Sequence, residues 1–241
     1  MHQRSQRVGP CSRALPRALF IGAWLLFLSG CGALSVPVTD NESPTVSVRA
    51  VVRPQPGAGS ERTGAGVEFG YEQYRAKDTR TLATGEVYSL GGVDVTGPDT
   101  LRQQATVSRA HVAWAHLIRF GPYFELEPFL GVARVNFRFK AEPVTSLLRP
   151  TINTSLTGVI GGVTPRWRFN EWLALELRIT ATNGSGMESF STDAGLLLSP
   201  VPNLSLRLGY SEREQTFHDD FSFRKIEVNA RGPSAQLQLQ F

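Results

Sequence analysis

Nine charged side chains recur at alternate positions of extended segments between residues 68 and 213. They are Glu68, Glu72, Arg109, Glu125, Glu127, Glu176, Arg178, Arg207 and Arg213. Alternate residues of a β-strand share one face. Charges of both signs enclosed on such a face must pair, because an isolated buried ion costs several kcal/mol. We therefore predict an ion-pair network among these residues, which His111 joins from the face of Arg109, with a narrow ion or proton path along them as the alternative.

Residues suited to catalysis or metal binding are few. The chain has four histidines and two cysteines, too few for a Cys-based zinc cluster. Ser108 and His116 are eight residues apart, too distant along one strand to form a hydrogen bond, and no third group is placed to orient the histidine. His218-Asp219-Asp220 could chelate a cation but is typical of a solvated loop tip. We predict no catalytic residue, no metal site and no cofactor.

The charge of the chain gives no support for nucleic-acid binding. The formal net charge is +4 over 241 residues, but residues 1–30 contain four arginines and no acidic residue. Without them the chain has 21 basic and 21 acidic residues. The basic character therefore belongs to the first thirty residues, and we predict no nucleic-acid partner.

The first thirty residues have the organisation of a signal peptide. Arginines precede an apolar run from Ala18 to Leu28, which is too short for a spanning helix of about 20 residues. The run ends in Leu28-Ser29-Gly30-Cys31, which resembles the bacterial lipobox. The resemblance implies that residues 1–30 are removed and that Cys31 carries lipid, and the following Gly32-Ala33 favours the outer membrane. An ordinary secretory leader cut after Ala33 is the alternative.

Residues 31–63 are expected to form a lipidated N-terminus and a periplasmic linker. Seven prolines and glycines interrupt regular structure between Pro37 and Gly64. Thr45–Arg53 alternates valines with polar residues and could be a strand.

From Gly64 onward the hydrophobic period is two, which predicts an all-β fold. Leu173, Leu175, Leu177 and Ile179 share one face, opposite Glu176 and Arg178. Several segments exceed the usual five or six residues of a strand, and tight turns alternate with longer connections. Aromatic residues flank the tight turns, and Phe137, Phe139, Phe217, Phe221 and Phe223 are expected to form a second belt near the opposite ends. From Phe124 to Phe137 a tilted strand rises about 33 Å, somewhat more than the ~25 Å apolar band of an outer-membrane barrel.

These features together resemble the small eight-stranded outer-membrane barrels of the OmpA type. The terminal Leu237-Gln238-Leu239-Gln240-Phe241 resembles the signal, ending in Phe241, that the barrel-insertion machinery reads. The resemblance implies an antiparallel up-and-down transmembrane β-barrel over residues 64–241, located in the outer membrane and surrounded by its lipid.

The expected barrel has eight strands, with both of its ends in the periplasm. The strands are Gly64–Ala76, Gln104–Arg119, Tyr123–Phe139, Asn153–Arg168, Trp172–Asn183, Glu188–Ser199, Asn203–Gln215 and Phe223–Phe241. Thr45–Arg53 would make nine, and Glu86–Val95 could bring the number to ten. The side-chain alternation changes parity near 128–134 and near 158–162, which predicts bulges there.

The sequence favours a non-enzymatic envelope protein, structural or interacting through its loops, whose lumen is occluded by the charged network. Loop Lys77–Gln103 is the largest expected external surface, although the sequence names no external ligand. Two other interpretations are a narrow pore and a lipid-anchored soluble β-barrel that binds a small apolar ligand. Some outer-membrane barrels modify lipid A with a His and Ser pair on the barrel wall, and such an enzyme is a further alternative.

Overall fold

The computed structural model describes residues 35–54, 64–90, 92–219 and 224–241, which form one compact unit. The predicted signal peptide (residues 1–30), Cys31 and two of the belt residues, Phe221 and Phe223, lie outside the described residues. Every regular element described is a β-strand, as the period of two in the sequence predicts.

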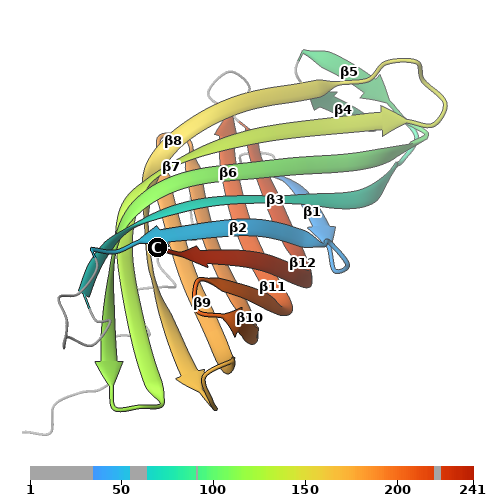
Figure 1. Ribbon diagram of the computed structural model, residues 1–241. Helices are drawn as coiled ribbons and strands as arrows, with labels where there is room; N and C mark the ends of the chain where they lie inside the picture. The colour runs from blue at the N-terminus through green and yellow to red at the C-terminus, as the bar shows by residue number, and fades with distance from the viewer. Residues whose placement is uncertain (1–34, 55–63, 91, 220–223) are drawn as a thin grey trace, which may run out of the picture. The chain divides into compact units, whose positions relative to one another are not determined.

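Twelve strands occur in the described residues (Figure 1). They are β1 (Ser35–Asp40), β2 (Thr45–Val52), β3 (Gly64–Leu82), β4 (Val87–Leu90), β5 (Val93–Thr96), β6 (Asp99–Phe120), β7 (Phe124–Pro143), β8 (Thr151–Arg168), β9 (Leu173–Gly184), β10 (Met187–Val201), β11 (Leu204–Asp219) and β12 (Arg224–Gln240). The strands β4 and β5 form a separate two-stranded hairpin, and the other ten belong to one sheet.

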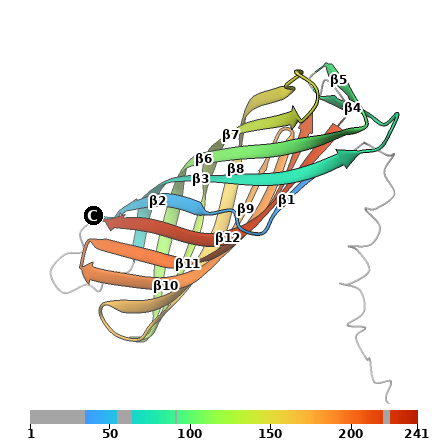
Figure 2. The same cartoon turned by 90° about the vertical axis from the view of Figure 1, so that its right-hand side faces the viewer.

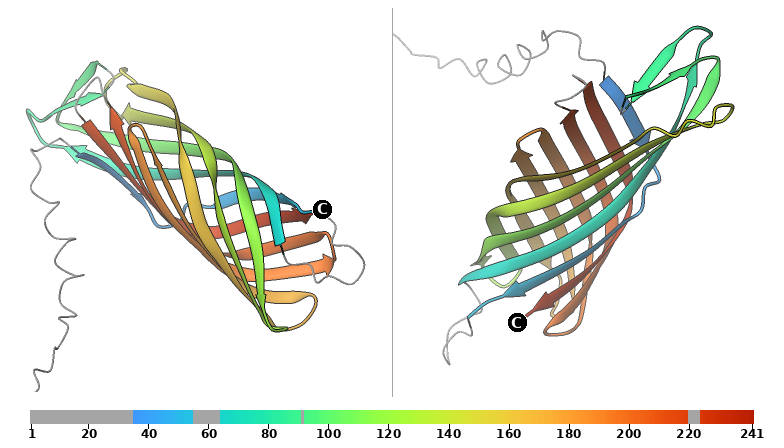
Figure 3. Two further views of the ribbon diagram at one scale, coloured as in Figure 1. Left: turned by 90° about the vertical axis from the view of Figure 1, so that its left-hand side faces the viewer. Right: turned by 90° about the horizontal axis from the view of Figure 1, so that it is seen from above.

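The large sheet closes into a ring of hydrogen bonds (Figures 2 and 3). From β2 through β3 and β6–β12, each strand pairs antiparallel with the next one. The ring closes because β12 also pairs in parallel with β1 and with β2, for example Val38 with Val228 and Val48 with Leu237. Since β1 and β2 lie along successive parts of β12, the ten strands occupy nine positions.

The expected count of eight strands, or ten, is therefore wrong. Residues 35–52, expected as linker, contribute two strands to the wall. Thr45–Val52 alternates outward valines with inward Thr45, Ser47 and Arg49. This strand therefore fits a barrel wall with an apolar outer face and a polar inner face. Without β2, both β3 and β12 would expose unpaired edges. An up-and-down ring with an odd number of positions must bring its first and last strands together in parallel, so the sheet is not purely antiparallel.

The two ends of the ring differ. One end, called here the tight-turn end, holds the short connections β6–β7, β8–β9 and β10–β11, together with Phe241, whose N–H donates to the Val51 carbonyl. The opposite, long-loop end holds the β4–β5 hairpin and the connection between β7 and β8. Figure 2 shows the hairpin and the C-terminus at opposite ends. Ser35 pairs with Lys225 at the start of β12, so β1 begins at the long-loop end. The expectation that both ends of the barrel lie on one side is therefore wrong.

The side chains alternate without the two predicted bulges. β7 and β8 pair in one unbroken register from Phe124 with Trp167 to Lys140 with Thr151. Odd-numbered residues of β7 face inward along its whole length, from Glu125 to Phe139. The apparent change of parity has another cause: the interior is charged near the tight turns and apolar near the long loops.

Apolar side chains fill the long-loop end of the ring. Phe137 stacks on Phe217 from the opposite wall with ring centroids 4.0 Å apart, and Phe139 lies beside Phe137. Tyr88 and Leu90 of the β4–β5 hairpin are buried in the same cluster. Phe137, Phe139 and Phe217 thus lie inside the ring, and their expected place in an outer belt is wrong. They pack against each other across the interior of the ring.

Candidate functional site

Twelve ionisable side chains are buried inside the part of the ring that lies nearer the tight turns. Six are carboxylates and six are guanidiniums: Glu68, Glu72, Glu125, Glu127, Glu176, Asp193, Arg49, Arg109, Arg166, Arg178, Arg207 and Arg213. They come from eight of the nine positions of the ring, all from positions that alternate inward. Their formal charges cancel, so the enclosed set is neutral.

Glu68, on β3, is the centre of one group and is fully buried. The guanidinium of Arg49 on β2 lies 2.7 Å from its carboxylate. Arg178, from β9 across the ring, pairs with the same carboxylate, and His111 Nε2 on β6 lies 2.9 Å from it. Arg178 also lies 3.9 Å from the ring centroid of Phe129, so its charge rests between a carboxylate and an aromatic face. Glu68 on β3 is thereby linked to β2, β6 and β9.

A second group runs as a chain of alternating signs. Arg166 lies 2.9 Å from Glu125 and 2.6 Å from Glu176. Glu176 also accepts a hydrogen bond from Gln238 and lies near Arg207.

The same chain continues toward the long-loop end. Arg207 and Arg213 both contact Asp193, at 3.4 and 3.0 Å. Glu72 then lies 3.2 Å from Arg213 and 2.9 Å from Arg109. Each interior carboxylate therefore touches at least one guanidinium, which offsets the cost of removing the charges from water.

Three further arginines surround the tight-turn mouth of the ring. Arg53 pairs with Glu127, which also pairs with Arg49. Arg119 and Arg168 lie 3.0 and 2.9 Å from Glu125. These three guanidiniums are partly exposed. The ion pairs therefore change from buried in the interior to partly exposed at the tight-turn mouth.

The space left among these side chains is small. A void of about 10 Å³ lies between Arg49, Glu72, Arg109, Arg178 and Asp193, room for no more than one water molecule. Apolar side chains fill the interior at the long-loop end.

The outer face of the same strands carries an apolar belt. The belt consists of every second residue, beginning with the first, in one segment of each strand. The segments are Val46–Val52 on β2, Ala65–Tyr71 on β3, Ala110–Phe120 on β6, Phe124–Val132 on β7, Val159–Trp167 on β8, Leu173–Ala181 on β9, Phe190–Leu198 on β10, Leu204–Tyr210 on β11 and Pro233–Phe241 on β12. No outward position of these described segments holds Asp, Glu, Lys or Arg. The belt lies at the level of the ion network, so charge is inside and apolar surface is outside.

The height of the belt can be estimated from the strand geometry. Ala110 to Phe120 on β6 is eleven residues and Phe124 to Val132 on β7 is nine, which are ten and eight steps, or about 33 and 26 Å along the strands. A tilt of about 40° reduces these lengths to roughly 25 and 20 Å. Nine to eleven residues is also the length of a strand that crosses a bilayer.

Polar residues replace the belt toward the long-loop end. The outward positions of β7 change from Leu130 and Val132 to Arg134, Asn136 and Arg138. Inside the ring the change is opposite, from Glu127 to Phe137. The polarity of the wall is therefore inverted along its length while the alternation of side chains continues.

All nine charged residues singled out from the sequence lie in the interior, and each of them is paired as described above. Sequence reasoning missed Arg49, Arg166 and Asp193. Arg49 lies in a segment assigned to the linker, and Arg166 lies beyond a supposed change of parity. Holding the period of two through Gly158–Gly162 would have placed Arg166 on the face of Thr164.

The other candidate residues lie apart from the network. Ser108 faces outward beyond the belt, whereas His116 faces outward within it and stacks on Trp114. His218 is exposed at the long-loop end. The described residues contain no group of three or more His, Cys, Asp or Glu arranged to hold a metal ion.

No family model matches the chain, no curated protein matches it, and no solved structure matches it. In the described part of the chain no helix is long and apolar enough to cross a membrane.

Proposed function

We propose that the chain is a β-barrel protein of the outer membrane, with a closed lumen, that acts through the surfaces it presents beyond the bilayer. One observation carries the proposal: an apolar outer belt without charged side chains surrounds a paired, charged interior at the same level. A soluble barrel requires the opposite arrangement, because water faces its outer wall. Hydrocarbon around the belt would remove the exposed apolar surface from water.

The aromatic residues at the borders of the belt support the same orientation. Phe120, Tyr123, Trp167 and Trp172 are exposed near the tight turns, and Tyr71 and Tyr210 lie at the opposite border. Aromatic residues favour the interface between hydrocarbon and water. In the proposed orientation the tight turns face the periplasm and the long-loop end faces outward.

Lipidation of Cys31 remains part of the proposal as a prediction from sequence. Only Gly32, Ala33 and Leu34 separate Cys31 from Ser35, where β1 begins at the long-loop end. A lipid on Cys31 is thus tethered within about 14 Å of that strand end. Ser35 pairs with Lys225, eight residues beyond the border of the belt at Pro233, or about 20 Å of height, so the outward leaflet lies nearer to this tether than the inner leaflet does.

A narrow pore is the competing function, and conductance measurements on the chain and on variants of the ion network distinguish the two. The proposal predicts that the full chain, inserted into planar bilayers, shows no steady conductance. A pore predicts conductance that falls when Arg178 or Arg207 is neutralised. Such conductance would overturn the closed lumen.

The experiment that tests membrane insertion compares gel mobility in detergent with and without heating, and flotation of the full chain with vesicles. We expect a heat-dependent shift and co-flotation that resists carbonate. A folded monomer recovered without detergent, after cleavage between Cys31 and Ser35, would instead favour the soluble, lipid-anchored barrel.

A further inference from the structure

A basic surface lies on the outer wall beyond the apolar belt, on β3 and β7, which flank β6. It consists of Arg75, Lys77, Arg134, Arg138 and Lys140. The inference drawn from it rests on the proposed function, because it names a partner for a barrel that is already surrounded by lipid.

The strand register places these cations in adjacent rows. One row runs from Arg75 through Thr106 and Arg138 to Asn153, and the next runs from Lys77 through Gln104 and Lys140 to Thr151. Arg75 and Arg138 are two strands apart, or about 10 Å between Cα atoms. Their long side chains can therefore reach a common ligand.

Among the described residues, the outward carboxylates nearest to the basic surface lie at its borders. Asp40 accepts a hydrogen bond from the backbone N–H of Lys77, and Glu142 is the register partner of Arg102 one row further. Within the described part of the chain none of the five basic side chains forms an ion pair.

The wall of β11 and β12 beyond the belt differs in charge. Its outward cations Lys225 and Arg231 pair with Glu227 and Glu212 at 2.7 and 2.5 Å. The concentration of unneutralised positive charge is therefore specific to the wall of β3, β6 and β7.

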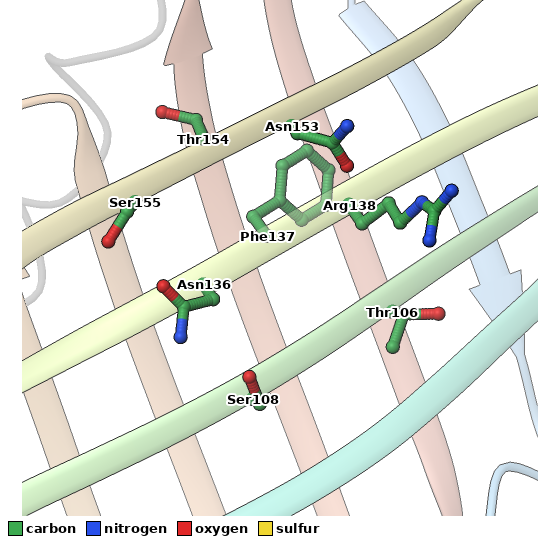
Figure 4. A pocket seen from close by; sticks show the side chains of 8 residues that line it. All are labelled: Thr106, Ser108, Asn136, Phe137, Arg138, Asn153, Thr154 and Ser155. Atoms are coloured by element: carbon green, nitrogen blue, oxygen red, sulfur yellow. The ribbon is translucent and has the colours of Figure 1, made fainter.

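A shallow hollow adjoins the cations, with a volume of about 360 Å³ (Figure 4). Thr106, Ser108, Asn136 and Ser155 line it with hydroxyl and amide groups, and Arg138 borders it. In Figure 4 the ring of Phe137 lies behind the ribbon, on the inner side of the wall. Arg134 Nε donates a hydrogen bond to Ser155 Oγ at 2.9 Å, which holds that guanidinium against the hollow.

We propose that this surface binds the phosphorylated sugar headgroup of a membrane lipid in the leaflet at the long-loop end. Guanidinium and ammonium groups pair with phosphate, and hydroxyl and amide groups suit the hydroxyls of a sugar. Phosphates of a lipid headgroup lie outside the hydrocarbon, and all five cations stand beyond the belt. Arg134 and Arg75 are two and four residues past its border, or about 5 and 10 Å of height. Lys77, Arg138 and Lys140 are six to eight residues past it, or about 15 to 20 Å, on the side of the sugar and its phosphates. The acyl chains of the same lipid would lie against Val112, Val132 and Val159, one row inside the boundary.

The test uses the full chain, folded in detergent, and lipid A bearing both phosphates as the probe, with retained lipid measured by native mass spectrometry. Arg75→Gln/Arg138→Gln should weaken retention about 30-fold, from two lost lipid–cation contacts. The matched control Lys225→Gln/Arg231→Gln removes the same charge from β12, where both cations are paired with carboxylates, and should change retention less than threefold. Lys77→Gln/Lys140→Gln, in the adjacent row, gives a second independent loss.

Three results would overturn the inference: equal retention of dephosphorylated lipid A, equal weakening by the control variant, or equal competition by phosphatidylglycerol. The first removes the role of phosphate, the second the specificity of the wall, and the third the role of the sugar. Heat-modifiable mobility and vesicle flotation of the same preparations report separately on the proposed function. A chain that inserts but shows no preference for lipid A refutes only the headgroup site.

Discussion

At the scale of single residues, the interior shows how a small ring can enclose twelve charges. Buried ion pairs are weak evidence for stability as such, because desolvation offsets much of their attraction. Removing one partner is a different matter, since the remaining charge is then buried without compensation. Glu68 is the clearest case, because Arg49, Arg178 and His111 all converge on it.

We expect Glu68→Gln to lower the free energy of unfolding by about 3–5 kcal/mol, as Arg49 and Arg178 then lose their shared carboxylate. Glu214→Gln, at an exposed outward position of β11, is the control and should change it by less than about 0.5 kcal/mol. Denaturant unfolding in detergent micelles, followed by tryptophan fluorescence, measures both. Equal stability of the two variants would contradict the central role of Glu68.

At the scale of elements, Asp99 at the start of β6 fixes the connection between β7 and β8. Its carboxylate accepts hydrogen bonds from the Thr145 hydroxyl at 2.7 Å and from the backbone N–H groups of Thr145 and Val144. These bonds, with that of the Thr145 hydroxyl the largest, lower the pKa of Asp99 below its usual value. Asp99 lies beyond the belt, at the long-loop end.

Because the pKa of Asp99 is lowered on folding, its contribution to loop order is present above about pH 4 and is lost as the pH falls through the lowered pKa. Asp99→Ala should therefore speed hydrogen exchange at Val144 and Thr145 at neutral pH. In the unmodified chain the same amides should lose protection only in acid. Unchanged exchange in the variant at neutral pH would show that another contact holds the loop.

At the same scale, the parallel pairing of β2 with β12 gives the ring nine strand positions instead of the expected eight. Val48 and Leu237 are register partners and both face outward. Neighbouring strands lie within the range of Cα separations that a disulfide spans.

In a Cys11→Ser/Cys31→Ser background, Val48→Cys/Leu237→Cys should form an intramolecular crosslink on mild oxidation. Val112→Cys/Leu237→Cys, with partners on separated strands, should not. Non-reducing gel mobility after proteolysis between β2 and β3 distinguishes the two. A chain in which residues 45–53 stay outside the ring would crosslink in neither variant.

At the scale of the whole molecule, the inverted polarity of the wall divides the ring into two parts. Near the tight turns the outside is apolar and the inside charged; near the long loops the outside is polar and the inside apolar. The first part suits hydrocarbon and the second suits water, so the long-loop part is expected to project beyond the bilayer. This division sets the orientation used in both proposals.

The orientation predicts which sites a protease reaches on intact cells. A protease site inserted at Leu147, which is 96% exposed between β7 and β8, should be cut from outside. The same site inserted at Gly121-Pro122, in the tight turn between β6 and β7, should be cut only after the cells are opened. Cleavage in the reverse order would contradict the orientation of the ring.

The sequence by itself determined the all-β fold, the long strands and the inward set of charges, since a period of two assigns faces without knowledge of partners. Glu176 and Arg178 could be placed opposite Leu175 and Leu177 from alternation alone. Only the tertiary structure decided that β1 and β2 complete the ring, because alternation within a short segment does not show which strand edges it pairs with. It also decided that Phe137 and Phe139 face inward: alternation tells which residues share a face, but not whether that face meets charge, apolar side chains or solvent at a given height.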